Sequence, residues 1–329
     1  MNDGQMGRWA DGQIAGHGQP TVHPSIRPSV QFFVLTLTSL FACTAKAGDA
    51  VREFDGAKAL GYAEQQVAFG PRVPNTPGHR AMGDWLAAQL ASRADTVIVT
   101  AWRHTTGRGR TLELRNFFAR FRPDARDRVL FVAHWDTRPV ADRDPNLGRQ
   151  RMPIDGANDG ASGVAVLLGI ADALKAKAPA VGVDLLFVDG EDYGDFGDST
   201  ESLLGAWRFA AEKPANYQPL FAVVFDMVGD KDLQIYYEGN SQSFAPEVVQ
   251  RVWRAAERLG YGGTFIHGVR HTLIDDHVPL QRVGIHAIDL IDYDYGPNNA
   301  YWHTGEDTID KISAQSLAIV GNVAISLVR

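Results

Sequence analysis

Beyond residue 50, the chain alternates between segments with apolar residues at helical spacing and short, nearly continuous apolar runs. The helical spacing predicts helices over 55–69, 77–93, 161–175, 202–212, 245–259 and 314–328. The apolar runs predict strands over 111–120, 128–133, 183–188, 220–226, 233–237 and 285–291. Alternating strands and helices are typical of a mostly parallel sheet covered on both faces. We therefore expect a single α/β domain over 48–329, with a mostly parallel, mixed open sheet and helices on both faces.

The first 47 residues do not follow this pattern. Arg27 precedes an apolar stretch over 30–42, and Ala45-Lys-Ala47 follows it. A positive charge, a short apolar core and a small-residue site, in that order, indicate a secretory signal, and the stretch is short for a bilayer span. We expect 1–47 to be a signal peptide or N-terminal extension, and the protein to be exported, either periplasmic or secreted. The alternative is that the stretch is a buried helix of the domain.

Composition narrows the partners and the chemistry. A net charge of −7 gives no reason to expect nucleic acid or an anionic membrane as a partner. Cys43 is the single cysteine, which excludes an intrachain disulfide and a thiolate metal cluster, so a metal must use His, Asp and Glu. The sequence Leu40-Phe-Ala-Cys43 loosely resembles a lipoprotein box, so a lipid anchor at Cys43 is the one membrane contact that we consider.

Five short polar clusters lie between positions 134 and 303, and four of them follow apolar runs that are typical of buried strands. The clusters are His134-Trp-Asp136, Asn158-Asp-Gly-Ala-Ser-Gly163, Asp189-Gly-Glu-Asp192, Phe225-Asp-Met227 and Trp302-His-Thr304. Carboxylates and imidazoles on rigid strand ends converge at the carboxyl edge of an α/β sheet. Order and chemistry together favour a zinc enzyme.

Each cluster also has a simpler interpretation. His134 and Asp136 share a strand face, so the carboxylate could orient the imidazole, but such pairs are more often structural. Asp159 could cap the following helix instead of binding metal. Asp226 lies in an apolar run and needs a charged partner. Glu191 and Asp192 are more telling, because one acid can bind metal while its neighbour moves protons.

Taken together, the clusters resemble the zinc-dependent family that holds aminopeptidases and glutaminyl cyclases (metallopeptidase family 28), over about 55–328. The opening segment Phe69–Gly78 is similar as well. The resemblance implies zinc ligands at Asp159, Asp192 and His303 and a proton shuttle at Glu191. Two-metal members use two more ligands, which correspond to His134 and Asp226, so one or two zinc ions are expected.

One departure from the family concerns Asp192, where the family usually has glutamate. Aspartate still offers a hard oxygen for zinc. Because its side chain is one methylene shorter, either the backbone must come closer or the coordination must change.

Two features resemble the cyclase branch of the family, namely Asp275-Asp276-His277-Val-Pro279 and Trp302 directly before His303. They imply an enzyme that converts N-terminal glutamine of peptides or proteins to pyroglutamate with release of ammonia. Asp226 and Asp275 would orient the amine and the amide, and Trp302 would wall a narrow pocket. The segment Asp292–Asn299 is interpreted as a solvated loop beside the site.

Two other functional classes are open. One is a zinc aminopeptidase that hydrolyses N-terminal residues, with Glu191 taking the proton from water. The other is a metal-free peptide-binding module, which the sequence does not favour because it leaves Glu191 beside Asp192 without a role.

Overall fold

A computed structural model of the protein describes residues 53–194, 198 and 200–329. The expected signal segment and Cys43 lie outside this part of the chain. Within it, no helix combines the length and the apolar character that a membrane span requires.

The central sheet has six strands in the order β1-β2-β4-β3-β5-β8. The four strands β3, β4, β5 and β8 pair in parallel, while β1 and β2 join the sheet through antiparallel pairs. The predicted mixed, mostly parallel sheet is therefore confirmed. In chain order the six strands are β1 Thr96–Thr105, β2 Thr111–Phe121, β3 Arg128–His134, β4 Gly182–Val188, β5 Phe221–Asp226 and β8 Ala287–Ile291.

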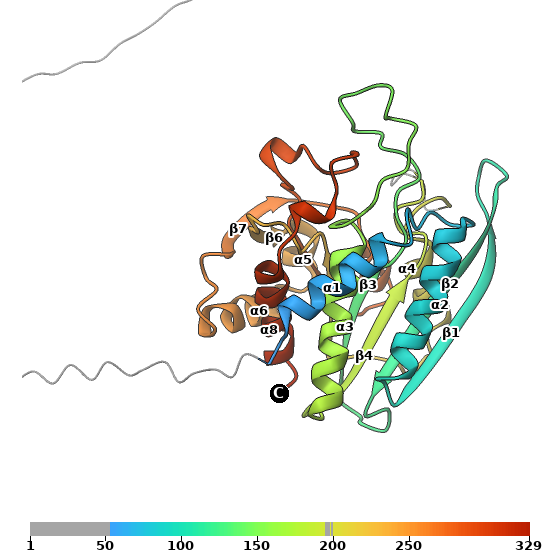
Figure 1. The fold of residues 1–329 in the computed structure, drawn as a ribbon. Helices are drawn as coiled ribbons and strands as arrows, with labels where there is room; N and C mark the ends of the chain where they lie inside the picture. The colour runs from blue at the N-terminus through green and yellow to red at the C-terminus, as the bar shows by residue number, and fades with distance from the viewer. Residues whose placement is uncertain (1–52, 195–197, 199) are drawn as a thin grey trace, which may run out of the picture. The chain divides into compact units, whose positions relative to one another are not determined.

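Helices cover both faces of the sheet, as the alternating pattern predicts (Figure 1). One face carries α1 Gly56–Val67, α2 Pro77–Ala91, α3 Ala161–Ala176 and α8 Ala314–Ser326, and the other carries α4 Leu204–Glu212 and α7 His277–Arg282. A smaller parallel sheet of β6 Ile235–Glu238 and β7 Phe265–His271 lies beside α5 Gly239–Phe244 and α6 Pro246–Arg258. The loop before α8 contains the 3₁₀ turns η1 Pro297–Asn299 and η2 Ile309–Lys311.

The core has two layers, separated by the sheet. In β3 the alternate residues Val129, Phe131 and Ala133 pack into the larger cluster, with α1, α2, α3 and α8. Leu130 and Val132 point into the smaller cluster, with residues of α4 and α7. Every residue of β3 is buried, which explains why its sequence is continuously apolar rather than alternating.

The pattern did not predict β1, β7, α5 and α7. Strand β1 forms the edge of the sheet and is largely exposed, so it lacks the apolar run used to recognise the inner strands. The β-branched residues from Thr96 to Thr100 are the signal that could have revealed it.

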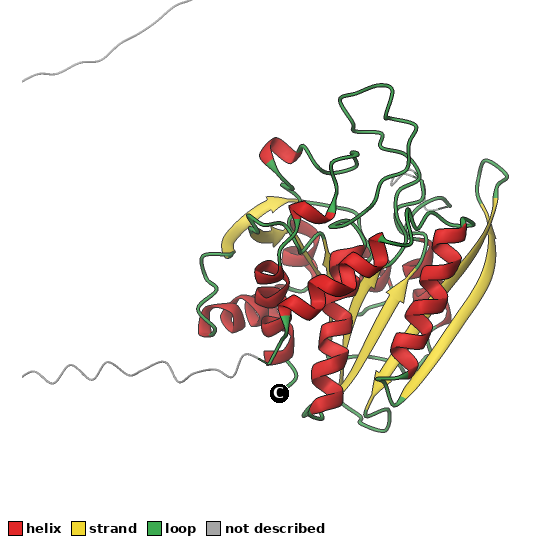
Figure 2. Ribbon diagram, in the orientation of Figure 1, coloured by secondary structure: helices red, strands yellow, loops and turns green. Residues whose placement is uncertain are grey.

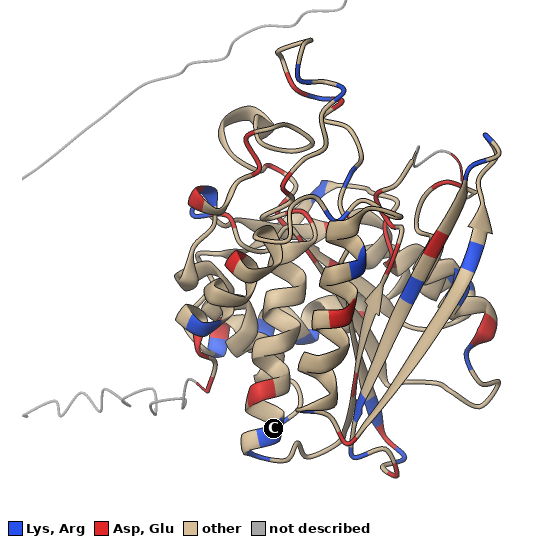
Figure 3. Cartoon of the chain, turned by 45° about the vertical axis from the view of Figure 1, so that its right-hand side comes forward, with Lys and Arg blue, Asp and Glu red and all other residues tan. Residues whose placement is uncertain are grey.

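The parallel arrangement brings the carboxyl ends of four strands to one edge of the sheet. Strand β3 ends at His134 and β5 ends at Asp226, while the turn after β4 carries Glu191 and Asp192. Figure 2 shows long loops gathered at the end toward which the β4 arrow points. Figure 3 shows both acidic and basic positions among these loops, as over the helices and outer strands.

Candidate metal centre

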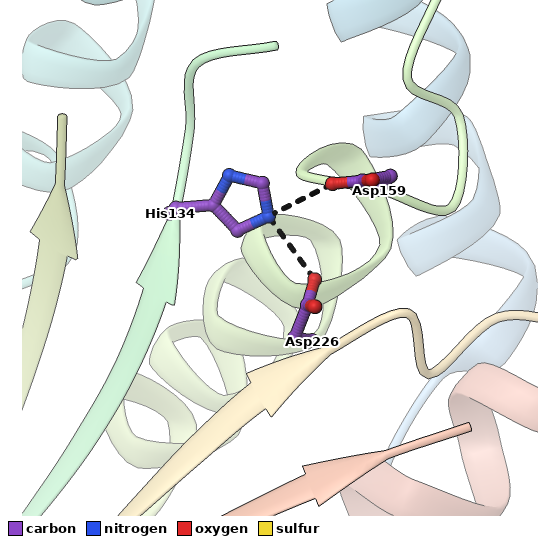
Figure 4. A group of neighbouring side chains, drawn as sticks. All are labelled: His134, Asp159 and Asp226. Carbon is purple, nitrogen blue, oxygen red and sulfur yellow. Dashed lines mark hydrogen bonds and ion pairs between the residues drawn. The ribbon is translucent and has the colours of Figure 1, made fainter. Parts of the chain in front are cut away.

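A first group of three buried side chains joins β3, β5 and the start of α3. His134 Nε2 lies 3.0 Å from Asp226 Oδ1 and 3.3 Å from Asp159 Oδ1 (Figure 4). One donor atom from each residue lies within 4.8 Å of the other two. The buried carboxylate of Asp226 thus has the partner that its apolar surroundings require.

A second group shares Asp159 with the first. His303 Nε2 lies 3.4 Å from Asp192 Oδ1 and 3.6 Å from Asp159 Oδ2. Again one donor atom from each residue lies within 4.8 Å of the others, and all three are buried. The three residues that the resemblance pointed to as zinc ligands therefore lie together, although Asp159 and His303 are far apart in sequence.

Backbone geometry at two positions holds this arrangement. Gly160 has φ of 95°, and a Cβ there would lie 2.6 Å from the carbonyl oxygen of Asp136, so the turn before α3 requires glycine. Helix α3 has no side-chain cap, so the capping interpretation of Asp159 is wrong. His303 adopts φ of 54°, a left-handed conformation uncommon for a residue with a side chain.

Two further aspartates fix the backbone beside the ligand candidates. Asp307 accepts the N–H groups of Asn158 at 2.8 Å and Asp159 at 3.2 Å. Asp136 accepts the N–H groups of Glu191 at 3.1 Å and Asp192 at 3.3 Å. Asp136 Oδ1 lies 3.7 Å from His134 Nδ1, which is too long for a hydrogen bond. Of the two interpretations of Asp136, the structural one therefore holds: its hydrogen bonds shape the turn of the acid pair instead of orienting His134.

The crowding of buried acids shifts the pKa values of the titratable groups. Burial raises the pKa of Glu191 well above its usual range against the opposing effect of His134, and burial raises that of Asp226 to about 7. Burial alone would lower the pKa of His303, but Asp192, Asp142 and Asp159 raise it to about 9. The raised pKa of His303 reflects the negative charge of the carboxylates around this imidazole, an arrangement that attracts a cation.

The donor set fits zinc. Zinc accepts imidazole nitrogen and carboxylate oxygen, and its catalytic sites commonly use three protein ligands. In the second group, Asp192 Oδ2 is buried without a hydrogen-bond partner among the described residues. Either group provides one imidazole and two carboxylates.

A cavity of about 330 Å³ opens over the centre. Glu191, Asp226 and Asp275 line it together with the second group, and Trp302 forms part of its wall. The Trp302 ring stacks on the His303 ring at a centroid distance of 3.9 Å. All predicted site residues therefore meet here, His134 included through the first group.

The structure adds residues that the sequence did not single out. Tyr293 lines the cavity and packs against Trp302 at 5.0 Å between ring centroids. Asp292 is buried and accepts the N–H of Gln234 at 2.8 Å, so interpreting this segment as a solvated loop was wrong at that residue. Arg138 contacts Asp192 at 2.9 Å, which no local sequence pattern indicates.

Comparison with known proteins agrees with this geometry. Residues 116–328 match the family described as peptidase family M28. Two curated bacterial relatives, each 26% identical, are matched over 54% and 40% of their own lengths, so the chain spans about half the length of these relatives.

Solved bacterial structures match over nearly their whole length. A leucine aminopeptidase precursor from Bacteroides thetaiotaomicron has a TM-score of 0.80 and 37% identity, covering 84% of this chain and 97% of that one. Porphyromonas gingivalis glutaminyl cyclase has a TM-score of 0.79 and 40% identity, and the match covers 83% of this chain and 96% of that one. A Zn-dependent exopeptidase from Parabacteroides distasonis has a TM-score of 0.79 and 38% identity, and the match covers 83% of this chain and 97% of that one. The chain therefore belongs to peptidase family M28 and is an enzyme.

Proposed function

We propose that the protein is a glutaminyl-peptide cyclotransferase, which converts N-terminal glutamine of peptides or proteins to pyroglutamate and releases ammonia. The observation that carries this proposal is the small cavity with three acids, Glu191, Asp226 and Asp275, beside the second group. Glutaminyl cyclases among the similar structures support it.

Cyclisation needs no water, because the substrate's own α-amine attacks its γ-carboxamide carbon. The new C–N bond forms as the bond to the amide nitrogen breaks, and one proton passes from the amine to the departing ammonia. Glu191 is assigned this proton transfer, since its buried carboxyl lies next to Asp192 at the cavity. Asp226 and Asp275 are assigned to hold the amine and the amide by hydrogen bonds.

Asp159, Asp192 and His303 are the residues that would hold zinc. When bound, zinc supplies a Lewis acid for the reacting carbonyl. Trp302 stacks on His303 and narrows the cavity, so the folded-back glutamine side chain is held close to its own amine.

The second candidate is a zinc aminopeptidase. The specific observation in its favour is the first group, His134 with Asp159 and Asp226, which completes the donor set for a second metal. The similar leucine aminopeptidase precursor also supports it. In that reaction Glu191 would take a proton from water rather than from the substrate amine.

A side-by-side assay separates the two functions. We expect release of ammonia from Gln-initiated peptides and slow hydrolysis of leucine amide by the zinc-loaded protein. Asp275→Asn should reduce cyclisation strongly while zinc stays bound, because the change removes charge but little volume. Rapid hydrolysis of leucine amide, two zinc ions per chain and no ammonia from Gln peptides would assign the protein to the aminopeptidases.

We also propose that the protein is exported and that 1–47 are removed. This proposal rests on the order of charge, apolar stretch and Ala45-Lys-Ala47 in the sequence. Mass spectrometry of the protein from its native host tests it. A mature chain that begins near residue 48 supports export, lipid on Cys43 selects the anchored form, and an intact N-terminus in the cytosol contradicts both.

A further inference from the structure

Two side chains of the loop after β3 contact the second group without belonging to it. Arg138 Nη1 lies 2.9 Å from Asp192 Oδ1, and Asp142 Oδ1 lies 3.3 Å from His303 Nδ1. Arg138 and Asp142 also face each other in a two-point ion pair, 2.9 Å from Nε to Oδ1 and 2.9 Å from Nη2 to Oδ2. A continuous line of contacts therefore runs from Asp192 through Arg138 and Asp142 to His303.

The position of Arg138 is firmly fixed. Its side chain is only 10% exposed, between Asp192 at 1% and Asp142 at 38%. Arg138 Nη1 also donates to the carbonyl oxygen of Gly194 at 2.9 Å, in the turn that carries the acid pair. A buried guanidinium held at several points has little freedom to move away from the carboxylate it contacts.

We propose that Arg138 and Asp142 are positioning residues for the metal centre. Arg138 fixes the carboxylate of Asp192, and Asp142 orients the imidazole of His303 while it neutralises Arg138. The inference rests on the proposed function, since it takes Asp192 and His303 as ligands.

The contact at His303 has the chemistry of a ligand support. An imidazole that binds zinc commonly has its second ring nitrogen next to a carboxylate, which fixes the tautomer and the ring orientation. Here Nδ1 faces Asp142 and Nε2 faces Asp159 and Asp192. The stacked Trp302 ring holds the imidazole from one of its faces.

The contact between Arg138 and Asp192 matters because Asp192 is one methylene shorter than the glutamate that the family usually has at this position. A shorter carboxylate reaches less far, so its orientation matters more than that of a glutamate. Arg138 holds Oδ1, while the buried Oδ2 has no hydrogen-bond partner among the described residues. Arg138 thus sets the direction of the one carboxylate in the centre that departs from the family pattern.

The opposite charges of Arg138 and Asp142 predict the direction in which zinc affinity changes when one or both are removed. A lone guanidinium beside a cation site repels the cation, but the carboxylate of Asp142 neutralises Arg138. Removing Asp142 alone leaves that positive charge beside the ligands and also removes the support of His303. Removing both residues leaves no added charge, so part of the loss should be recovered.

Zinc affinity of the full chain, measured by competition with a chelating indicator, tests the pair. We expect Asp142→Asn to weaken zinc binding by about 10–100-fold, the usual range for a residue that supports a zinc ligand. The double variant Asp142→Asn, Arg138→Gln should bind zinc more tightly than Asp142→Asn alone. Arg149→Gln is the matched control, because Arg149 lies in the same loop and pairs with exposed Glu306 at 3.2 Å.

Other outcomes overturn the inference separately from the proposed function. If Asp142→Asn binds zinc within threefold of the unmodified protein while His303→Ala loses zinc, the positioning role is wrong and the ligand assignment stands. If Arg138→Gln alone binds zinc within threefold of the unmodified protein, the positioning role of Arg138 is wrong. If Arg138→Gln costs as much zinc affinity in the Asp142→Asn background as in the unmodified protein, the neutralising role is wrong. If His303→Ala keeps full zinc affinity, the assignment of His303 as a ligand is wrong, and the inference that rests on it is wrong as well. Asp142 is partly exposed beside a cavity of about 700 Å³, so asparagine fits there, and thermal unfolding checks the fold of each variant.

Discussion

At the scale of single residues, the environment of Glu191 separates it from its neighbour. Both residues line the cavity, but the Asp192 carboxylate is tied to Arg138 at 2.9 Å, whereas Glu191 Oε2 has His134 Nδ1 at 3.6 Å. Adjacent acids in the sequence thus lie in different surroundings. This difference suits one residue to bind a metal and the other to transfer a proton.

Glu191→Gln should keep the fold and the zinc but lose activity. Glutamine has nearly the same shape but cannot accept and return a proton, and such catalysis is typically worth about 10²–10⁴-fold in rate. Steady-state rates and zinc content of the same preparation provide the measurement. Glu247→Gln, on the exposed surface of α6, is the control and should leave both unchanged. Activity within a few-fold of the original would assign proton transfer to another residue.

At the scale of elements, the contact between α3 and β5 is unusually close. A Cβ added at Gly163 would lie 2.1 Å from the carbonyl oxygen of Phe225 and 3.0 Å from Ala133 Cβ. Glycine at this position lets the start of α3 lie directly against the strand that ends at Asp226. The distance between Asp159 and Asp226 depends on this approach.

Gly163→Ala should therefore destabilise the protein by about 1–3 kcal/mol or more, because the added methyl group overpacks a contact with backbone. Gly61→Ala, in the interior of α1, is the control, since no atom lies within 4 Å of the added Cβ. That change should stabilise the protein by up to about 1 kcal/mol. Urea unfolding of both variants measures the two effects, and equal effects would contradict the close approach.

Comparing the predicted elements and site residues with the structure shows what the sequence could and could not predict. Apolar runs identified β3, β4 and β5 because these strands are buried on both faces. Strand β1 was missed because one-sided exposure at an edge weakens the pattern. The ligand candidates could be found from their motifs, but Arg138 and Asp142 could not. Their contacts depend on how three separate loops meet in space, and neither residue stands in a motif.

At the scale of the whole molecule, stability reflects buried carboxyl groups beyond the metal centre. Burial raises the pKa of Asp292 to about 7, the N–H of Gln234 opposes the shift, and the charges of Asp230 and Asp294 add to it. The unfolded value is near 3.8. Because the folded pKa is the higher one, the carboxyl does not destabilise the fold below about pH 4, and its cost grows as the pH rises toward 7.

Asp292→Asn should therefore stabilise the protein increasingly between about pH 5 and pH 8. Asparagine keeps an oxygen that can accept from Gln234 and removes the buried charge. Since one pKa unit corresponds to about 1.36 kcal/mol, the gain above pH 8 is at most about 4 kcal/mol. Urea unfolding at several pH values measures it, with Glu64→Gln on the exposed surface of α1 as reference. A gain that is the same at every pH would mean that titration of Asp292 is not its cause.

Asp159 belongs to both groups, and this has a thermodynamic consequence. Two cation sites that share one carboxylate are linked, so a cation at one site changes the affinity of the other by a factor that applies equally in reverse. Two like charges held by one carboxylate also repel each other. Stepwise binding constants from a metal titration would therefore belong to the pair of sites, not to His134 or His303 individually. The enzyme's metal content should accordingly depend on the free metal concentration at which it is measured.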